Sequence, residues 1–132
     1  MIAKNNPFNI RNNVGNNWLG QTGSNKGFCV FSRLEYGVRA ACIIICRSYR
    51  KRGVLTIQEI INTFAPSSEN NTDEYIEFVC KMTSAFPFDI PTSSEFPFLL
   101  NAMSIYEGNR VSVEFIIHVM ESFNIVPYGC RK

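Results

Sequence analysis

The stretch that decides the fold is Ser32–Gly53, which reads SRLEYGVRAACIIICRSYRKRG. Its apolar side chains recur at the spacing of one helix face; they are Leu34, Val38, Ala41, Cys42, Ile45 and Tyr49. Ser32 and Glu35 have the spacing of a capping box, in which the Ser side chain caps a backbone N–H and the Glu side chain reaches back. Gly53 is a natural C-terminal stop. The stretch therefore predicts one long amphipathic helix.

Further helices are predicted downstream on the same criteria. Thr56 and Glu59 form a second capping box, and Pro66 ends that helix because the residue before a proline leaves the α region. Thr72 and Ser112 are the expected N-caps of two later helices. The predicted helices after the first run from Thr56 to Phe64, from Thr72 to Met82, from Thr92 or Ser94 to Gly108, and from Ser112 to Phe123.

The first 31 residues have a different character, because Asn and Gly abound and apolar residues are isolated. Gly27–Phe31 is typical of a strand, since β-branched and aromatic residues dominate it. Asn9–Arg11 and Trp18–Gly20 are weaker strand or bend candidates. The expected fold is therefore mainly α, of the α+β class. It has about five helices and a small N-terminal β subregion, in a single domain over residues 1–132.

Composition excludes several classes of protein. Lys and Arg number 13 against 11 Asp and Glu, and a formal net charge of +2 is too small for a nucleic-acid-binding surface. The longest apolar run, Ala40–Cys46, is far shorter than the roughly 20 residues of a membrane-spanning helix. Met1–Asn5 begins no apolar segment, so we expect a protein made in the cytoplasm without a secretory signal.

The cysteines and the histidine predict neither a disulfide framework nor a metal site. The five cysteines form an odd set without a Cys-x-x-Cys pair, which favours a reduced protein. One His and scattered Cys give no metal-ligand spacing, and no cofactor is expected. Cys29 and His118 could form a thiol-dependent amidase. The favoured interpretation is that Cys29 is a buried thiol and that His118 is a packed or surface side chain.

Six ordered motifs resemble those of bacteriophage and prophage proteins. Such proteins start with Asn-Pro-x-Asn-Ile-Arg and continue with Trp-x-Gly and Gly-Phe-x-x-Phe. The matching segments here are Asn6–Arg11, Trp18–Gly20, Gly27–Phe31, Glu35–Ala40, Ala65–Tyr75 and Ile105–Gly108. The resemblance is to virion-associated, lysozyme-like proteins that process peptidoglycan, and it implies a lysozyme-like fold. The start also resembles a region of glucosaminidases in which a catalytic Glu lies just upstream, but Met1–Asn5 contains no acid.

A peptidoglycan glycosidase, either a muramidase or a lytic transglycosylase, needs a carboxylic acid that protonates the leaving oxygen. Glu107 is the first candidate, because it ends an apolar helix beside Gly108 as the acid of a lysozyme-like fold does. The β region precedes that helix here, which is the order of a circularly permuted lysozyme. Glu35 is the second candidate and is expected to face the cleft. A solvated helix end for Glu107 and a capping role for Glu35 are the alternatives.

The candidate substrate-binding residues are Asn9, Arg11, Trp18, Tyr36 and Glu69. Amides both donate to and accept from sugar hydroxyls, and aromatic rings can stack on a sugar face. Turn formation by Asn9, core packing of Trp18 and a solvated loop position for Glu69 are the alternatives.

The expected partners are the glycan strands of peptidoglycan, together with other virion or secretion-machine proteins. Neither nucleic acid nor membrane insertion is expected. The protein would be virion-associated or delivered to the cell wall. The alternative function is a non-catalytic virion structural or cell-wall-binding module of the same fold.

Overall fold

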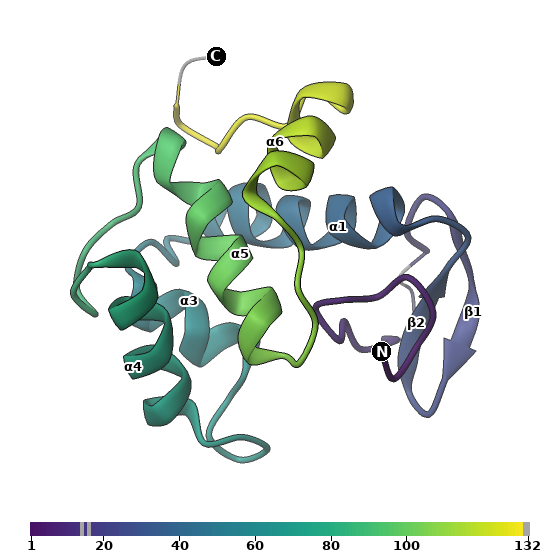
Figure 1. The fold of residues 1–132 in the computed structure, drawn as a ribbon, viewed down its shortest axis with the longest axis horizontal. Coiled ribbons are helices and arrows are strands. Elements are labelled where there is room, and N and C mark those ends of the chain that lie inside the picture. The colour runs from purple at the N-terminus through teal and green to yellow at the C-terminus, as the bar shows by residue number, and fades with distance from the viewer. Residues whose placement is uncertain (14, 16, 131–132) are drawn as a thin grey trace.

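The computed structural model describes residues 1–13, 15 and 17–130, and has the expected α+β class. A two-stranded sheet near the N-terminus precedes a series of helices (Figure 1). The strands are β1 (Gln21–Asn25) and β2 (Phe28–Phe31). The helices are α1 (Leu34–Ile43), a π-helical turn (Ile44–Ser48), α2 (Tyr49–Lys51), α3 (Ile57–Phe64), α4 (Thr72–Thr83), a 3₁₀ turn (Ser93–Glu95), α5 (Phe96–Tyr106) and α6 (Val113–Ser122).

The predicted long helix is present as a continuous rod formed by α1, the π-helical turn and α2. It ends at Gly53, as predicted, where the backbone has a φ of 78° that suits glycine. Its start differs from the prediction, because the N-cap is Arg33 and no side chain caps the helix. The Ser32 N–H instead donates to the Gly20 carbonyl at 2.9 Å. Ser32 thus belongs to the β part, and the predicted capping box of Ser32 and Glu35 is wrong.

The other predicted caps were partly right. The Thr56 side chain and Glu59 form the expected capping box on α3, and Ser112 caps α6. Asn71 rather than Thr72 caps α4, by accepting from the Glu74 N–H at 3.2 Å. Thr72 is buried, and its hydroxyl donates to the Ala65 carbonyl at 2.6 Å, so this side chain joins α4 to the end of α3 instead.

One buried asparagine attaches the N-terminal segment to the sheet. The Asn6 side chain is fully buried and donates to the carbonyls of Ile10 and Cys29, each at 2.9 Å. Its Oδ1 atom accepts from the Ile10 N–H at 2.9 Å. Arg11 then pairs with Phe28 in an isolated antiparallel bridge beside β2. Since every polar group of Asn6 is satisfied, this side chain fixes the path of residues 6 to 11.

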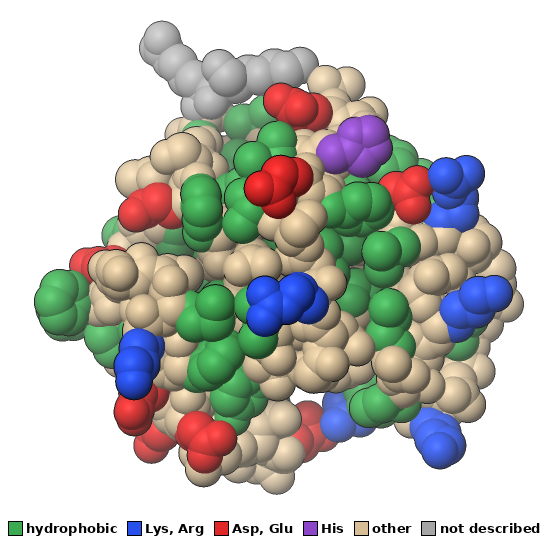
Figure 2. Space-filling model, viewed as in Figure 1, with side chains coloured by type: hydrophobic (Ala, Val, Ile, Leu, Met, Phe, Trp, Pro, Cys, Tyr) green, Lys and Arg blue, Asp and Glu red, His purple; other side chains and the backbone are tan. Residues whose placement is uncertain are grey.

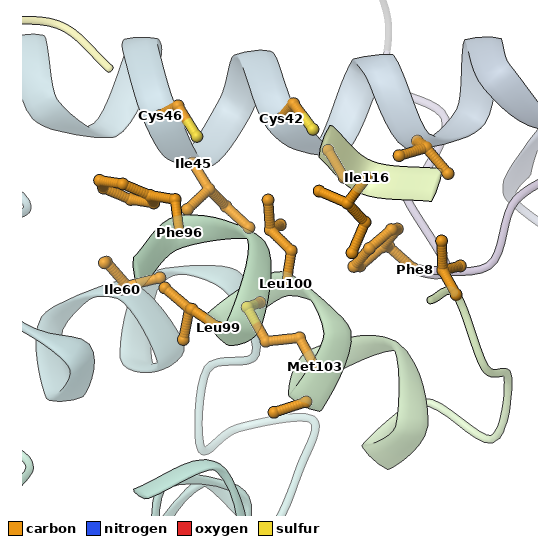
Figure 3. Packing of buried hydrophobic residues seen from close by; sticks show 14 of the residues in the cluster. Phe8, Cys42, Ile45, Cys46, Ile60, Phe96, Leu99, Leu100, Met103 and Ile116 are labelled. Carbon is orange, nitrogen blue, oxygen red and sulfur yellow. The ribbon is translucent and has the colours of Figure 1, made fainter. Parts of the chain in front are cut away.

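The core lies between the long helix and α5, with α3 and α6 adding further apolar side chains (Figure 3). Cys42 and Cys46 lie on the same face of the rod as Ile45 and point toward α5. All five cysteines are free thiols. Burial raises the pKa of the Cys42 thiol to about 12, so this residue behaves as a small apolar side chain. No helix of the described residues is long and apolar enough to cross a membrane.

The backbone of the N-terminal segment comes close to α1 at Gly37, and Gly37→Ala should destabilise the protein. An added Cβ atom would collide with the backbone carbonyl oxygen of Asn5, and backbone cannot move aside as a flexible side chain can. We expect a loss of about 1–3 kcal/mol in the free energy of unfolding, as for overpacking. Urea denaturation measures it. Gly23→Ala is the matched control, because no atom lies within 4 Å of its added Cβ. Equal losses in the two variants would contradict the close approach.

Candidate functional site

A groove of about 770 Å³ separates the N-terminal β part from α3, with the long helix along it. The residues that line it come from the N-terminal β part, the long helix, α3 with the turn after it, and the end of α5. They are Ile2, Asn9, Ile10, Arg11, Asn13, Trp18, Phe28, Ile44, Ser48, Tyr49, Arg52, Thr63, Phe64, Ala65, Pro66, Glu69, Asn70 and Glu107. Five of the predicted site residues are therefore together in one groove: Asn9, Arg11, Trp18, Glu69 and Glu107.

Glu107 enters the groove from the C-terminal end of α5. The helix ends there because Gly108 turns the chain with a φ of 89°. The Asn9 side chain donates from Nδ2 to the Glu107 Oε1 atom at 2.8 Å and also reaches the Glu107 carbonyl at 3.3 Å. Asn109 in turn donates to the Pro7 carbonyl at 3.0 Å. These bonds confirm that the Asn-rich N-terminal region packs beside the helix that ends at Glu107.

Burial dominates the electrostatics of the Glu107 carboxyl. Removal of water raises the pKa of Glu107 above its ordinary value, since the charged form loses hydration. Hydrogen bonds from Asn9 and Tyr75 act in the opposite direction, and burial is the larger effect. A carboxyl with a raised pKa is suited to donate a proton, because its acid form persists closer to neutral pH.

Tyr75 is a site residue that the sequence did not reveal. The periodicity of α4 marks it only as a core-facing side chain. Its ring stacks on Tyr106 with centroids 4.1 Å apart, and its hydroxyl donates to the Met103 carbonyl at 3.4 Å. The same hydroxyl lies near enough to Glu107 to lower the pKa of that carboxyl, against the effect of burial. Burial raises the pKa of the Tyr75 hydroxyl, and the Glu107 charge raises it further, so the hydroxyl is a hydrogen-bond donor. A buried tyrosine needs a partner for its O–H, and that requirement was the available signal.

Arg11 and Glu69 face each other in the same groove. The Arg11 Nε atom lies 3.6 Å from the Glu69 Oε2 atom, and both side chains are about half exposed. The Arg11 guanidinium also lies 5.0 Å from the centroid of the Phe28 ring. Glu69 belongs to the turn after α3, where its N–H donates to the Pro66 carbonyl at 3.0 Å. This ion pair links the N-terminal segment to the connection between α3 and α4.

Trp18 is half-buried at the groove, beside the turn that leads into β1. Its backbone N–H donates to the Gln21 Oε1 atom at 3.2 Å. Its indole Nε1 atom is buried and has no hydrogen-bond partner among the described residues. The ring packs against the core, as the packing interpretation expected, and also lines the groove.

The structure places Glu35 and Tyr36 outside the groove. The Glu35 carboxylate accepts from Arg33 Nη2 at 2.9 Å, so the expectation that Glu35 faces the cleft is wrong. The Tyr36 ring covers Gly20 and packs against Phe123 with centroids 6.1 Å apart. Both residues lie in the first turn of α1, which is held between the β part and the end of α6.

The alternative chemistries lack geometric support in the described residues. Burial raises the pKa of the Cys29 thiol, the opposite of what a thiolate nucleophile needs. His118 is exposed on α6 and contacts the Phe115 ring, while Cys29 is buried in β2. No cluster of three metal-ligating side chains occurs in the described part of the chain. Figure 2 shows acidic and basic side chains scattered over one face, without a continuous basic patch.

A second hollow of about 300 Å³ lies between α4 and the start of α5. Its two carboxylates are already used by the local backbone. Asp89 accepts from the Phe86 N–H and Glu95 from the Thr92 N–H, each at 2.8 Å. The groove at Glu107 therefore has the better-placed chemistry.

The raised pKa of Glu107 predicts a pH-dependent cost in stability. As pH rises, the unfolded chain releases this proton near its ordinary value of 4.5, before the folded protein does. The wild type therefore loses stability through that range, down to a plateau above the folded pKa. Glu107→Gln cannot ionise and therefore escapes this loss. The free energy of unfolding of the variant, minus that of the wild type, should be larger at neutral pH than below pH 4.5. Urea denaturation at both pH values measures this, and a constant difference would contradict the burial effect.

Comparison with known proteins relates this chain to a phage protein. No protein family matches the sequence. Protein P5 of Pseudoalteromonas phage PM2 is 30% identical over 106 residues, which cover 77% of this chain and 66% of P5. This chain is similar to a bacteriophage protein. The similarity spans just under two thirds of P5, so it relates part of that protein to most of this one.

Proposed function

We propose that the protein is a peptidoglycan-degrading glycosidase that works with a phage, prophage or injection system. The observation that carries the proposal is Glu107, a half-buried carboxyl with a raised pKa at the wall of an open groove. Cleavage of a glycosidic bond needs such an acid to protonate the leaving oxygen. Glu107 is the general acid in this proposal.

The rest of the groove suits a glycan. Side-chain amides of Asn13 and Asn70 line it and can both donate to and accept from sugar hydroxyls and N-acetyl groups. The Trp18 and Phe28 rings line it as well and offer apolar surface to a sugar ring. Arg52 is an exposed cation in the groove, suited to the carboxylates of cell-wall peptides.

Two observations support the phage association and the lysozyme-like architecture. The similarity to a protein of phage PM2 favours a virion-associated or wall-delivered role. The β part precedes the helices and packs against the end of the Glu107 helix, as a circularly permuted lysozyme requires.

Clearing of purified cell walls tests the proposal. The wild-type protein should clear a zymogram of peptidoglycan and lower the turbidity of a wall suspension. The alternative is a non-catalytic virion structural or wall-binding module of the same fold. Binding of the protein to walls that it does not clear would support that alternative.

A further inference from the structure

We propose that Glu69 is the general base of the reaction, the group that activates water for attack on the anomeric carbon. This inference rests on the proposed function and extends it to a specific chemistry, hydrolysis. Among the described residues, Glu69 and Glu107 are the two carboxylic acids that line the groove. Sequence patterns alone favour a solvated loop position for Glu69, and its place in the groove is what changes that interpretation.

A single short segment holds both acids. Asn9 binds the Glu107 carboxyl at 2.8 Å, and Arg11, two residues later, lies 3.6 Å from the Glu69 carboxylate. Two residues span at most about 7 Å of chain, so the two acids are held from neighbouring points. Ile10, which lies between Asn9 and Arg11, is held by hydrogen bonds from its N–H and its carbonyl to the Asn6 side chain. The same segment, residues 9 to 11, therefore holds both acids, Glu107 through Asn9 and Glu69 through Arg11.

The two acids have contrasting surroundings. Glu107 is half-buried, accepts a hydrogen bond from the neutral Asn9 side chain at 2.8 Å and lies near the Tyr75 hydroxyl. Glu69 is about half exposed and lies beside the positive charge of Arg11. Glu107 is thereby suited to give a proton, and the Glu69 carboxylate, half exposed beside Arg11, is open to water in the groove. Both carboxyls line the same groove of about 770 Å³, which is large enough to hold water.

The reaction that follows is balanced. The water oxygen bonds to the anomeric carbon and its proton passes to Glu69. The bond from that carbon to the glycosidic oxygen breaks, and the leaving oxygen takes the proton of Glu107. The products are two glycan fragments, one of which has a new reducing end. A lytic transglycosylase uses no water in this step and forms an anhydro ring instead.

The test compares glutamates inside and outside the groove on purified peptidoglycan. Glu69→Gln should reduce the release of reducing ends by about 10²–10⁴-fold, the usual contribution of a general base. Glu77→Gln is the matched control, because Glu77 is exposed on α4 outside the groove. It should keep the wild-type rate. Thermal denaturation shows that each variant is folded.

Chemical rescue separates catalysis from structure. Sodium azide should restore cleavage by Glu69→Ala and give a glycosyl azide in the mass spectrum, since the azide anion attacks without losing a proton. It should not restore Glu107→Gln, whose leaving group still lacks a proton donor.

Arg11 is a positioning residue here, so Arg11→Gln should slow the reaction and Arg11→Lys should recover most of the rate.

Each outcome decides the proposal. Wild-type rates for Glu69→Gln would overturn it, as would a folded Glu69→Ala variant that azide does not rescue. Anhydro-sugar products from the wild type would also overturn it, while leaving the proposed glycosidase intact. A wild-type protein that cleaves no wall at all would instead mean that the proposed function itself has failed.

Discussion

Replacing Glu107 by glutamine is expected to abolish wall-degrading activity. The amide keeps the size of the side chain and can still accept the hydrogen bond from Asn9, so the fold should be unaffected. It has no proton to transfer to the leaving oxygen, and general acid catalysis contributes about 10²–10⁴-fold in rate. The rate of reducing-end release from purified walls measures the loss.

Glu35→Gln provides the control for the loss at Glu107. Glu35 lies outside the groove and is paired with Arg33, so its replacement should leave the rate unchanged. His118→Ala should also be active, because this exposed residue of α6 does not line the groove. Loss of activity in Glu35→Gln with a full rate in Glu107→Gln would mean that the general acid has been misassigned.

Phe8→Ala is expected to cause the largest loss of stability. Phe8 is fully buried and points into the core between Ile116 and the N-terminal segment (Figure 3). Truncation of a buried Phe leaves a cavity and costs about 3–5 kcal/mol in the free energy of unfolding. Urea denaturation measures this, with Phe88→Ala as the control.

Phe88 is 72% exposed, and its ring stacks on the ring of Phe86, which is itself exposed. Its removal should change stability by less than about 0.5 kcal/mol, as at ordinary surface positions. A small loss for Phe8→Ala would contradict the account that the N-terminal segment is an integral part of the core.

Much of the fold could be predicted because its signals are local. The helical spacing from Leu34 to Tyr49 and the capping box at Thr56 and Glu59 depend on residues within a few turns of each other. The caps at Ser32 and Thr72 were mispredicted for the opposite reason. Their polar groups bond to distant residues, Gly20 and Ala65, and those tertiary contacts override the local pattern.

The candidate site was predictable in its residue types but not in its connections. Glu107 is marked by its place between an apolar helix and Gly108. Its contact with Asn9 spans 98 positions in the sequence, and no periodic pattern reports such a distance. Tyr75 was missed because helical periodicity shows which side chains are buried and not which polar group a buried hydroxyl meets.

Release of reducing ends from purified peptidoglycan by the wild-type protein tests the central claim most directly. The account predicts that reducing ends accumulate in proportion to time and protein concentration, and that Glu107→Gln releases none above background. A folded wild-type protein that binds the walls but releases neither reducing ends nor anhydro sugars, from acidic to neutral pH, would contradict it.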